Sequence, residues 1–253
     1  MRPYILAETN WEIVRNTQFD LAVLPWGATE AHNYHLPYAT DNYQVDFVLE
    51  KAAEKAWQNG TKALIMPCIP FGVNTGQMDI PFCINLNPST QYAIIKDVAE
   101  VLRRAGIRKF VIMNGHGGNH FKQMLRELSI EYPDIFACAG NWYQAEDPAA
   151  YFTDLGDHAG ELETSVMQVI RPDLVQPLSQ AGNGHAKQWT IEALRKGWVS
   201  SQRQWSKVTA DTGVGDPSQA TAERGERFLA AVIDNVSQFF QELADADVDQ
   251  LYT

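Results

Sequence analysis

Residues 20–41 read DLAVLPWGATEAHNYHLPYATD. The stretch begins with a short apolar run that is typical of a buried strand, and it ends with two acids and two histidines: Glu30, His32, His35 and Asp41. Charged groups placed where a strand leaves the core are costly to bury unless they are paired or bind a metal ion. The stretch therefore predicts a strand with an ionic site at its carboxyl end.

Similar apolar runs recur along the chain, at 62–67, 109–113 and 135–139. Segments with helical periodicity lie between and after them, at 42–58, 90–105, 120–131, 160–170 and 220–241. The apolar runs are nearly continuous rather than alternating, as in a parallel sheet that is covered on both faces. Strands that alternate with helices imply crossover connections, so we expect an α/β fold, a three-layer α/β/α sandwich around a mostly parallel sheet.

Two local expectations accompany this fold. Pro88-Ser89 is a plausible N-cap for the helix over 90–105, and Gly106 should end it. Ligands of open parallel sheets gather beyond the carboxyl ends of the strands, where residues 26–41 and 114–120 would both lie. We expect one domain over residues 1–253.

Composition limits the possible partners. The 253 residues carry a net charge of −11 without a run of Lys or Arg, which argues against a nucleic acid or an anionic membrane. No apolar stretch reaches the ~18 residues that span a bilayer, and Glu8 interrupts any secretory signal. Three distant cysteines (Cys68, Cys83 and Cys138) are typical of reduced thiols in a cytoplasmic protein.

The first candidate site comprises Glu30, His32 and Asp41. In an extended chain, side chains two residues apart point to the same side, so Glu30 and His32 can face one ligand. Two carboxylates and an imidazole suit Zn²⁺, Mn²⁺ or Fe²⁺. The alternative is that Asp41 caps a helix while Glu30 and His32 lie on a solvated loop.

The second candidate is the glycine-rich segment NGHGGNH at 114–120, directly after an apolar run. Its glycines let the backbone approach a ligand closely, and backbone N–H groups there could stabilise an anion or oxyanion. His116 would leave the sheet at its carboxyl end, whereas His120 is more typical of a first helical turn. A phosphate cradle is the alternative, but the segment lacks the Lys-Ser/Thr of a P-loop.

The third candidate is GDHAGELETS at 156–165, where His158 precedes a probable helix. Glu161 and Glu163 fall in the first turn of that helix, where acids commonly complement the helix dipole. His185 lies in a loop-like segment and receives no role. Because no serine lies in a G-x-S-x-G elbow and no cysteine has a nearby catalytic partner, metal-assisted hydrolysis is the chemistry that remains.

These segments together resemble the creatininase (creatinine amidohydrolase) family of metal-dependent amidohydrolases. The similar stretches occur in family order at 29–41, 114–119, 158–165, 212–218 and 220–223. The resemblance implies a dinuclear metal site, with Zn²⁺ and/or Mn²⁺ as the expected ions and Fe²⁺ as a further possibility. By motif position, Glu30, Asp41 and His116 would hold one ion, and His32 and the bridging Asp41 the other.

In creatininase itself the second ion also takes a glutamate, at the position that Gly118 occupies here. Glu163 is our candidate for the missing acid, as in family members of the Gly-His-Gly-Gly-Asn type. His158 would pass a proton to the leaving nitrogen. Gly117, Gly118 and Asn119 would bind the substrate or the oxyanion.

The resemblance implies a hydrolase of a non-peptide or cyclic amide C–N bond, attacked by metal-bound hydroxide. The alternatives are a metallopeptidase or formamide deformylase of the same family, or a non-catalytic metal-binding protein. Creatinine should be a poor substrate, because the Trp-Asp pair that binds its ring in creatininase is replaced by Asp154-Leu-Gly-Asp157. Trp142 or Tyr143 could supply a stacking surface instead.

The resemblance also implies a homo-oligomer, which could be a hexamer. Three tryptophans, Trp189, Trp198 and Trp205, could serve such an interface, although a place in the core is the plainer interpretation.

Overall fold

Parallel strands form the centre of the computed structural model, which describes residues 1–252. Within those residues the sheet has the order β2-β1-β3-β4. The strands are β1 (Leu21–Trp26), β2 (Ala63–Ile65), β3 (Lys109–Asn114) and β4 (Phe136–Asn141). Each coincides with a predicted apolar run, although β2 is shorter than predicted.

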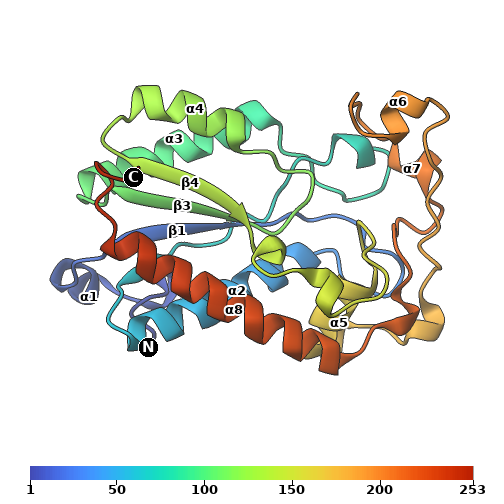
Figure 1. Ribbon diagram of the computed structural model, residues 1–253, viewed down its shortest axis with the longest axis horizontal. Helices are drawn as coiled ribbons and strands as arrows, with labels where there is room; N and C mark the ends of the chain where they lie inside the picture. Colours follow the sequence, from blue (N-terminus) through green and yellow to red (C-terminus); the bar gives the residue numbers. More distant parts are fainter. Residues whose placement is uncertain (253) are drawn as a thin grey trace.

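Helices cover both faces of this sheet (Figure 1). One layer contains α2 (Thr40–Gln58) and α8 (Ala222–Asp245), with α5 (Glu161–Ile170) packed against both. The opposite layer contains α3 (Pro88–Arg104) and α4 (Lys122–Glu131). The predicted three-layer α/β/α sandwich is confirmed.

Short elements occupy the connections. These are α1 (Trp11–Asn16), α6 (Glu192–Arg195), α7 (Trp205–Val208), η1 (Leu6–Glu8), η2 (Thr75–Gln77), η3 (Trp142–Gln144), η4 (Pro148–Ala150), η5 (Pro172–Leu174), η6 (Leu178–Gln180) and η7 (Pro217–Gln219).

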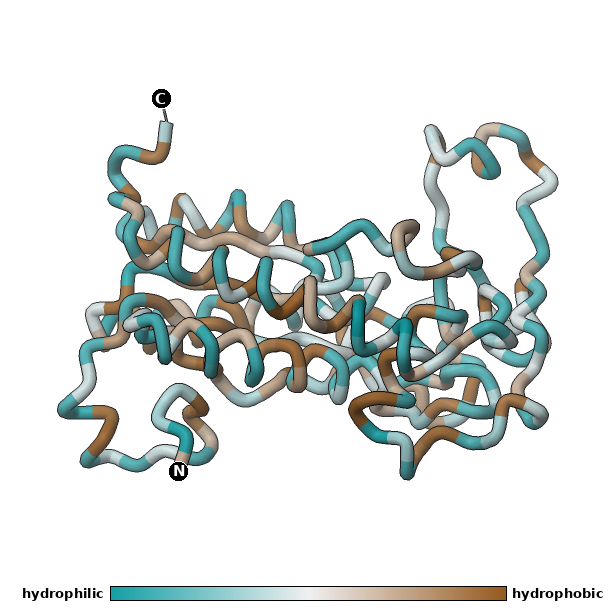
Figure 2. The backbone as a smooth tube through the Cα atoms, turned by 60° about the horizontal axis from the view of Figure 1, so that its bottom comes forward, coloured by the Kyte–Doolittle hydropathy of each residue, from teal (hydrophilic) through white to brown (hydrophobic). Residues whose placement is uncertain are grey.

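Alternate side chains of β1 enter two different cores. Leu21 and Val23 pack in the cluster that contains residues of α2 and α8, whereas Ala22 and Leu24 pack in the cluster on the α3 side. Because successive strand residues point to opposite faces, a strand covered on both sides needs apolar residues at every position. Figure 2 shows the complementary pattern in the helices, where hydrophobic and hydrophilic segments alternate along the tube.

The connections leave β1 and β3 in opposite directions. The crossover from β1 to β2 runs through α2 on one face, and the crossover from β3 to β4 runs through α4 on the other (Figure 1). The carboxyl ends of β1 and β3 pair side by side, with Trp26 opposite Asn114. A crevice opens at such a topological switch point, and here it lies between the two predicted ligand-bearing loops.

Two predicted helix starts were wrong. Helix α3 begins at Pro88 with Asn87 at its N-cap, and proline suits the first helical position because no partner is needed for its missing N–H. Helix α4 begins at Lys122, so His120 lies on the preceding loop rather than in a first turn.

The tryptophans near the carboxyl-terminal part of the chain have different environments. Trp205 is only 8% exposed, as the core interpretation predicted, whereas Trp198 is 75% exposed and that interpretation was wrong for it. Residues 1–252 contain no helix that is both long enough and apolar enough to cross a membrane.

Candidate metal centre

The predicted ligand residues reach one place from four segments. Glu30 and His32 lie on the loop after β1, and Asp41 lies in the first turn of α2. His116 lies on the loop after β3, and Glu163 lies in the first turn of α5. Four of these residues are buried and Glu163 is half-buried, so the solvated-loop alternative for Glu30 and His32 was wrong.

Glu30, Asp41 and His116 form one group of atoms that could hold a metal ion. The Nδ1 atom of His116 lies 2.9 Å from Glu30 Oε1 and 3.1 Å from Asp41 Oδ2. Both of these buried oxygens lack a hydrogen-bond partner. The opposite ring nitrogen, Nε2, donates to the carbonyl oxygen of Val73 at 3.1 Å, which leaves the Nδ1 lone pair directed at the two carboxylates.

The charges around His116 favour a cation. Burial lowers its pKa, but the Glu30 and Asp41 carboxylates outweigh burial and raise the pKa well above its usual value. The same carboxylates would attract a divalent ion. Two oxygens and one imidazole nitrogen are donors that suit Zn²⁺, Mn²⁺ or Fe²⁺.

His32, Asp41 and Glu163 form a second such group. The Nε2 atom of His32 lies 3.0 Å from Asp41 Oδ1 and 3.9 Å from Glu163 Oε1. Its Nδ1 atom donates to the carbonyl oxygen of Glu30 at 3.1 Å, so Nε2 can present a lone pair to a metal ion. Burial opposes protonation of His32, yet Asp41 and Glu163 raise its pKa to about 10.

Asp41 belongs to both groups through different oxygens. Its Oδ1 faces His32 and its Oδ2 faces His116. Burial favours the protonated acid, but the neighbouring histidines hold the pKa of Asp41 well below its usual range. This arrangement is the geometry that a bridging carboxylate requires, although the ligand roles themselves stay predictions.

The two acids in the first turn of α5 have different partners. Glu161 is fully buried, and its Oε2 accepts hydrogen bonds from the Thr153 backbone and hydroxyl and from the Asp154 backbone. Its Oε1 pairs with Arg224. Glu163 instead directs Oε1 toward His32, so Glu163 is the acid that can replace the one missing at Gly118.

His158 lies beside the ligand residues but belongs to neither of the two groups that share Asp41. Its Nε2 donates to the carbonyl oxygen of Ala31 at 2.8 Å, and its Nδ1 lies 3.8 Å from Glu30 Oε1. Its ring and the Trp205 ring form a T-shaped pair, with the ring centroids 5.3 Å apart. Glu30, His32 and His158 also form a third group close enough to hold an ion.

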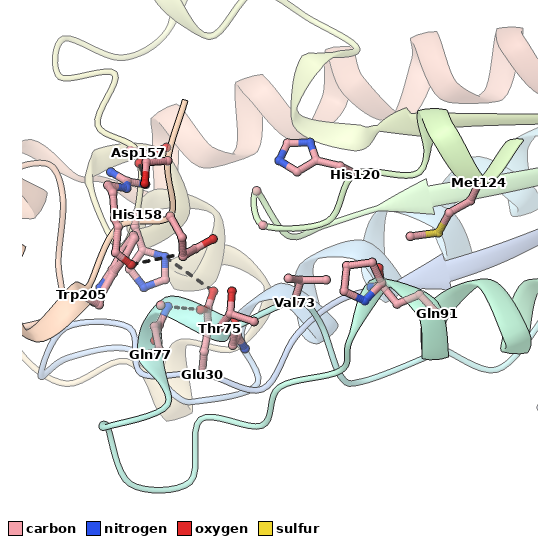
Figure 3. Close-up of a pocket in the computed structure, with 18 residues that line it drawn as sticks. Glu30, Val73, Thr75, Gln77, Gln91, His120, Met124, Asp157, His158 and Trp205 are labelled. Atoms are coloured by element: carbon pink, nitrogen blue, oxygen red, sulfur yellow. Dashed lines mark hydrogen bonds and ion pairs between the residues drawn. The ribbon is translucent and has the colours of Figure 1, made fainter. Parts of the chain in front are cut away.

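Two cavities meet at this centre. One, of about 460 Å³, extends from Glu30 and His158 toward His120 and Met124 (Figure 3). The other, of about 360 Å³, is lined by the ligand carboxylates and by residues that include Trp142 and Tyr143. Both volumes are in the range of small-molecule sites.

The glycine-rich loop approaches the site closely because Gly118 has no side chain. A Cβ at Gly118 would lie 2.4 Å from His116 Nε2 and 2.5 Å from the Val73 carbonyl oxygen, so only glycine permits the hydrogen bond between them. Gly117 and Gly118 both line the larger cavity. This position near the ligands is compatible with the substrate or oxyanion role that we predicted.

Asn119 does not have a side-chain atom left for a substrate. Its Oδ1 accepts from the Val73 N–H and from Gln91, and its Nδ2 donates to Asn114 and to the Gly27 carbonyl oxygen. The Asn119 side chain thus fastens the loop, and the substrate or oxyanion role predicted for this residue stays a prediction.

The other histidines are outside the ligand groups. His35 is buried and shares a 2.8 Å hydrogen bond between its Nε2 and the Thr164 hydroxyl, and burial lowers its pKa to about 4. His120 is exposed on the wall of the larger cavity, and His185 is exposed elsewhere.

Sequence reasoning missed Gln77 and Val73. Gln77 donates its side-chain amide to Glu30 Oε2, and the Val73 carbonyl oxygen orients His116. A histidine, cysteine or acid is visible as a ligand type, but a glutamine or a backbone carbonyl in a distant loop carries no such signal.

This chain is similar to several known proteins. The family model described as creatininase, creatinine amidohydrolase, matches residues 7–240. The mycofactocin precursor peptide peptidase of Mycobacterium tuberculosis is 29% identical over 231 residues, covering 84% of this chain and 81% of that protein. The creatinine amidohydrolase of Pseudomonas putida is 30% identical over 174 residues, covering 60% of this chain and 65% of that protein.

Solved structures show the same fold. A Bacteroides fragilis NCTC 9343 protein with a provisional creatinine amidohydrolase assignment superposes with a TM-score of 0.93 at 42% identity, and the match covers 100% of both chains. A manganese form of creatininase superposes with a TM-score of 0.80 at 23% identity, covering 97% of this chain and 100% of that one. The family model spans most of the residues that build the sandwich and its buried ionic centre, and this chain belongs to the creatininase family.

Proposed function

We propose that this protein is a hydrolase that uses two divalent metal ions to cleave the C–N bond of a small amide other than a peptide bond. The observation that carries the proposal is the division of the Asp41 carboxylate between two groups of ligand atoms. The buried, unpartnered oxygens of Glu30 and Asp41 support it, because such oxygens are costly unless a cation completes them.

The residues at this centre fit two divalent ions, either Zn²⁺ or Mn²⁺. Glu30, Asp41 and His116 would hold one ion, and His32, Asp41 and Glu163 the other. When bound, such ions polarise a carbonyl group and lower the pKa of water. Gly117 and Gly118 line the larger of the two cavities, and their backbone would orient the substrate carbonyl.

His158 is the group that we assign to proton transfer. Its Nε2 is committed to the Ala31 carbonyl oxygen, so Nδ1 is the nitrogen that can exchange a proton with a bound molecule. Nδ1 lies beside Glu30, and His158 lines both cavities. From there it would donate a proton to the departing nitrogen, a contribution worth about 10²–10⁴ in rate.

The surroundings of His158 argue against creatinine as the preferred substrate. Asp154 is occupied in capping the backbone N–H groups of Gly156 and Asp216, and Asp157 pairs with Arg203. Trp142 lines the smaller cavity but is almost completely buried, which leaves little of its ring for stacking.

A second candidate is a metallopeptidase. It is favoured by the mycobacterial peptide peptidase, which matches a larger share of this chain than the Pseudomonas creatinine amidohydrolase does. The two cavities that meet at the ligands could also accept the two halves of a dipeptide.

A substrate panel separates these candidates. Creatinine, hydantoin, a formamide and several dipeptides would be assayed with the Mn²⁺- and Zn²⁺-loaded protein, before and after treatment with a strong chelator. We expect a non-peptide amide to be cleaved faster than creatinine and the dipeptides. This cleavage should occur only in the metal-loaded protein. Preferential cleavage of dipeptides would make it a peptidase. Full activity after complete metal removal would refute the metal-dependent mechanism, and a loaded protein inert on the whole panel would favour a non-catalytic role.

A further inference from the structure

We propose that Gln77 is a positioning residue that makes Glu30 a one-oxygen metal ligand. The inference rests on the binuclear site proposed above and adds a residue from a loop that contributes no ligand to it. Gln77 is only 4% exposed and belongs to η2, on the long connection between β2 and α3.

The two oxygens of Glu30 have different environments. Oε2 accepts a hydrogen bond from the side-chain amide of Gln77. Oε1 has no hydrogen-bond partner and lies 2.9 Å from His116 Nδ1, among the other atoms of its ligand group. The Gln77 contact therefore occupies Oε2 and leaves Oε1 available to an ion.

The direction of the Gln77 amide is set from its other side. The thiol of Cys83 donates to Gln77 Oε1 at 3.2 Å, and the same sulfur accepts from the Ala31 N–H at 3.3 Å. If the amide were flipped, its oxygen would face the Glu30 carboxylate, and two acceptors would then be opposed. The thiol thus keeps the donor nitrogen toward Glu30.

The backbone that carries Gln77 is held in place. Its own N–H donates to the Asn74 carbonyl oxygen at 2.9 Å, and its carbonyl oxygen accepts from the Ile80 N–H at 3.0 Å. The turn packs against α7, and the Ser206 hydroxyl bonds to Asp79. A donor fixed in this way can fix the carboxylate that it contacts.

Loss of the Gln77 donor would affect one ion more than the other. Glu30 could then rotate or offer both oxygens at once, which would disturb the group that contains His116. The group of His32, Asp41 and Glu163 does not include Glu30 and should be largely retained. Replacing an outer partner of a metal ligand typically lowers metal affinity by about 10–100-fold.

The test compares Gln77→Met with Gln91→Met. Both are buried glutamines that line the larger cavity, but the Gln91 amide bonds to Asn119 rather than to a predicted ligand. Mn²⁺ binding to the metal-free variants would be titrated by electron paramagnetic resonance, with folding verified by circular dichroism. We expect Gln77→Met to bind one ion about 10–100-fold more weakly and the other within about threefold of wild type. Gln91→Met should bind both normally.

Gln77→Asn provides a second variant if the methionine variant does not fold. It keeps an amide but is one methylene too short to reach Glu30, so it should show the same loss at one ion. Unchanged binding of both ions in a folded Gln77 variant would overturn the inference, and so would equal weakening of both. Binding of fewer than two ions by the wild-type protein would instead overturn the binuclear function proposed above.

Discussion

Glu161 and Glu163 stand two residues apart on α5, yet their carboxylates meet different surroundings. Every oxygen of Glu161 is used by the protein itself, through Arg224 and the backbone at Thr153 and Asp154. Glu163 has an oxygen directed toward His32. Their local sequence makes them two similar first-turn acids. The family resemblance singled out Glu163, and the partners in the folded chain leave no oxygen of Glu161 free.

This contrast gives a matched pair of variants. Glu163→Gln should lower metal content toward one ion per chain, because a neutral amide is a poor ligand for a hard cation. Glu161→Gln should keep two ions but lose about 1–3 kcal/mol of stability, because its buried partners lose a charged acceptor. Metal analysis and urea unfolding of both variants check this. If Glu163→Gln retained two ions, Glu163 would not be a ligand, and its carboxylate would only complement the dipole of α5.

His158 should behave differently from the ligands. His158→Ala should retain both ions while turnover falls about 10²–10⁴-fold, the usual cost of removing a general acid–base group. Metal content and single-turnover rates on whichever substrate the panel identifies would be measured together. Loss of one ion in this variant would show that His158 is a ligand, through the third group with Glu30 and His32.

At the scale of elements, α2 carries a second acid one turn beyond Asp41. Burial and the nearby Glu50 raise the pKa of Asp46 to about 6, with a contact from the Cys68 thiol acting in the opposite direction. The unfolded value is near 3.9. The folded protein therefore binds this proton more tightly, so the associated stability is present below about pH 4 and is lost as the pH rises through about 6.

Asp46→Asn removes that dependence. The variant should be more stable than wild type at pH 8, where the wild-type carboxyl is ionised in a half-buried position, and should lose about half of this advantage at pH 5, which lies between the unfolded and folded pKa values. Free energies of unfolding in urea at both pH values measure the difference. An advantage of equal size at pH 5 and pH 8 would mean that ionisation of Asp46 is not its cause.

The elements were largely predictable, and their long-range partners were not. Nearly continuous apolar runs identified the strands because a doubly covered sheet requires them, and β1 shows this residue by residue. The ligand-bearing segments were visible because they concentrate histidines and acids at strand ends. The Gln77–Glu30 and Arg224–Glu161 contacts join residues 47 and 63 positions apart, and no local pattern encodes such pairs.

At the scale of the whole molecule, a chain with a net charge of −11 buries several carboxylates at one end of its sheet. Ions that bind only the folded chain should stabilise it, by about 2.7 kcal/mol at a free concentration of 100 Kd. For a protein of this size, each kcal/mol raises Tm by about 2–4 °C.

Chelation should therefore lower Tm by several degrees, and added Mn²⁺ or Zn²⁺ should restore it. Asp41→Ala should show no such response, because it removes the one residue that both ligand groups share. Differential scanning calorimetry of wild type and variant, with and without chelator, measures the shifts. An identical Tm for the loaded and stripped wild-type protein would contradict a structural contribution from the ions.

The origin of the ligands in four segments also governs when the centre can assemble. As the chain leaves the ribosome, Glu30, His32 and Asp41 emerge within a dozen residues of one another. His116 follows only after β3 is synthesised, and Glu163 still later with α5. With the ligands proposed above, each ion would depend on a residue from a later part of the chain. Metal loading would consequently be a late step of biogenesis, and a truncated nascent chain could not yet retain the pair.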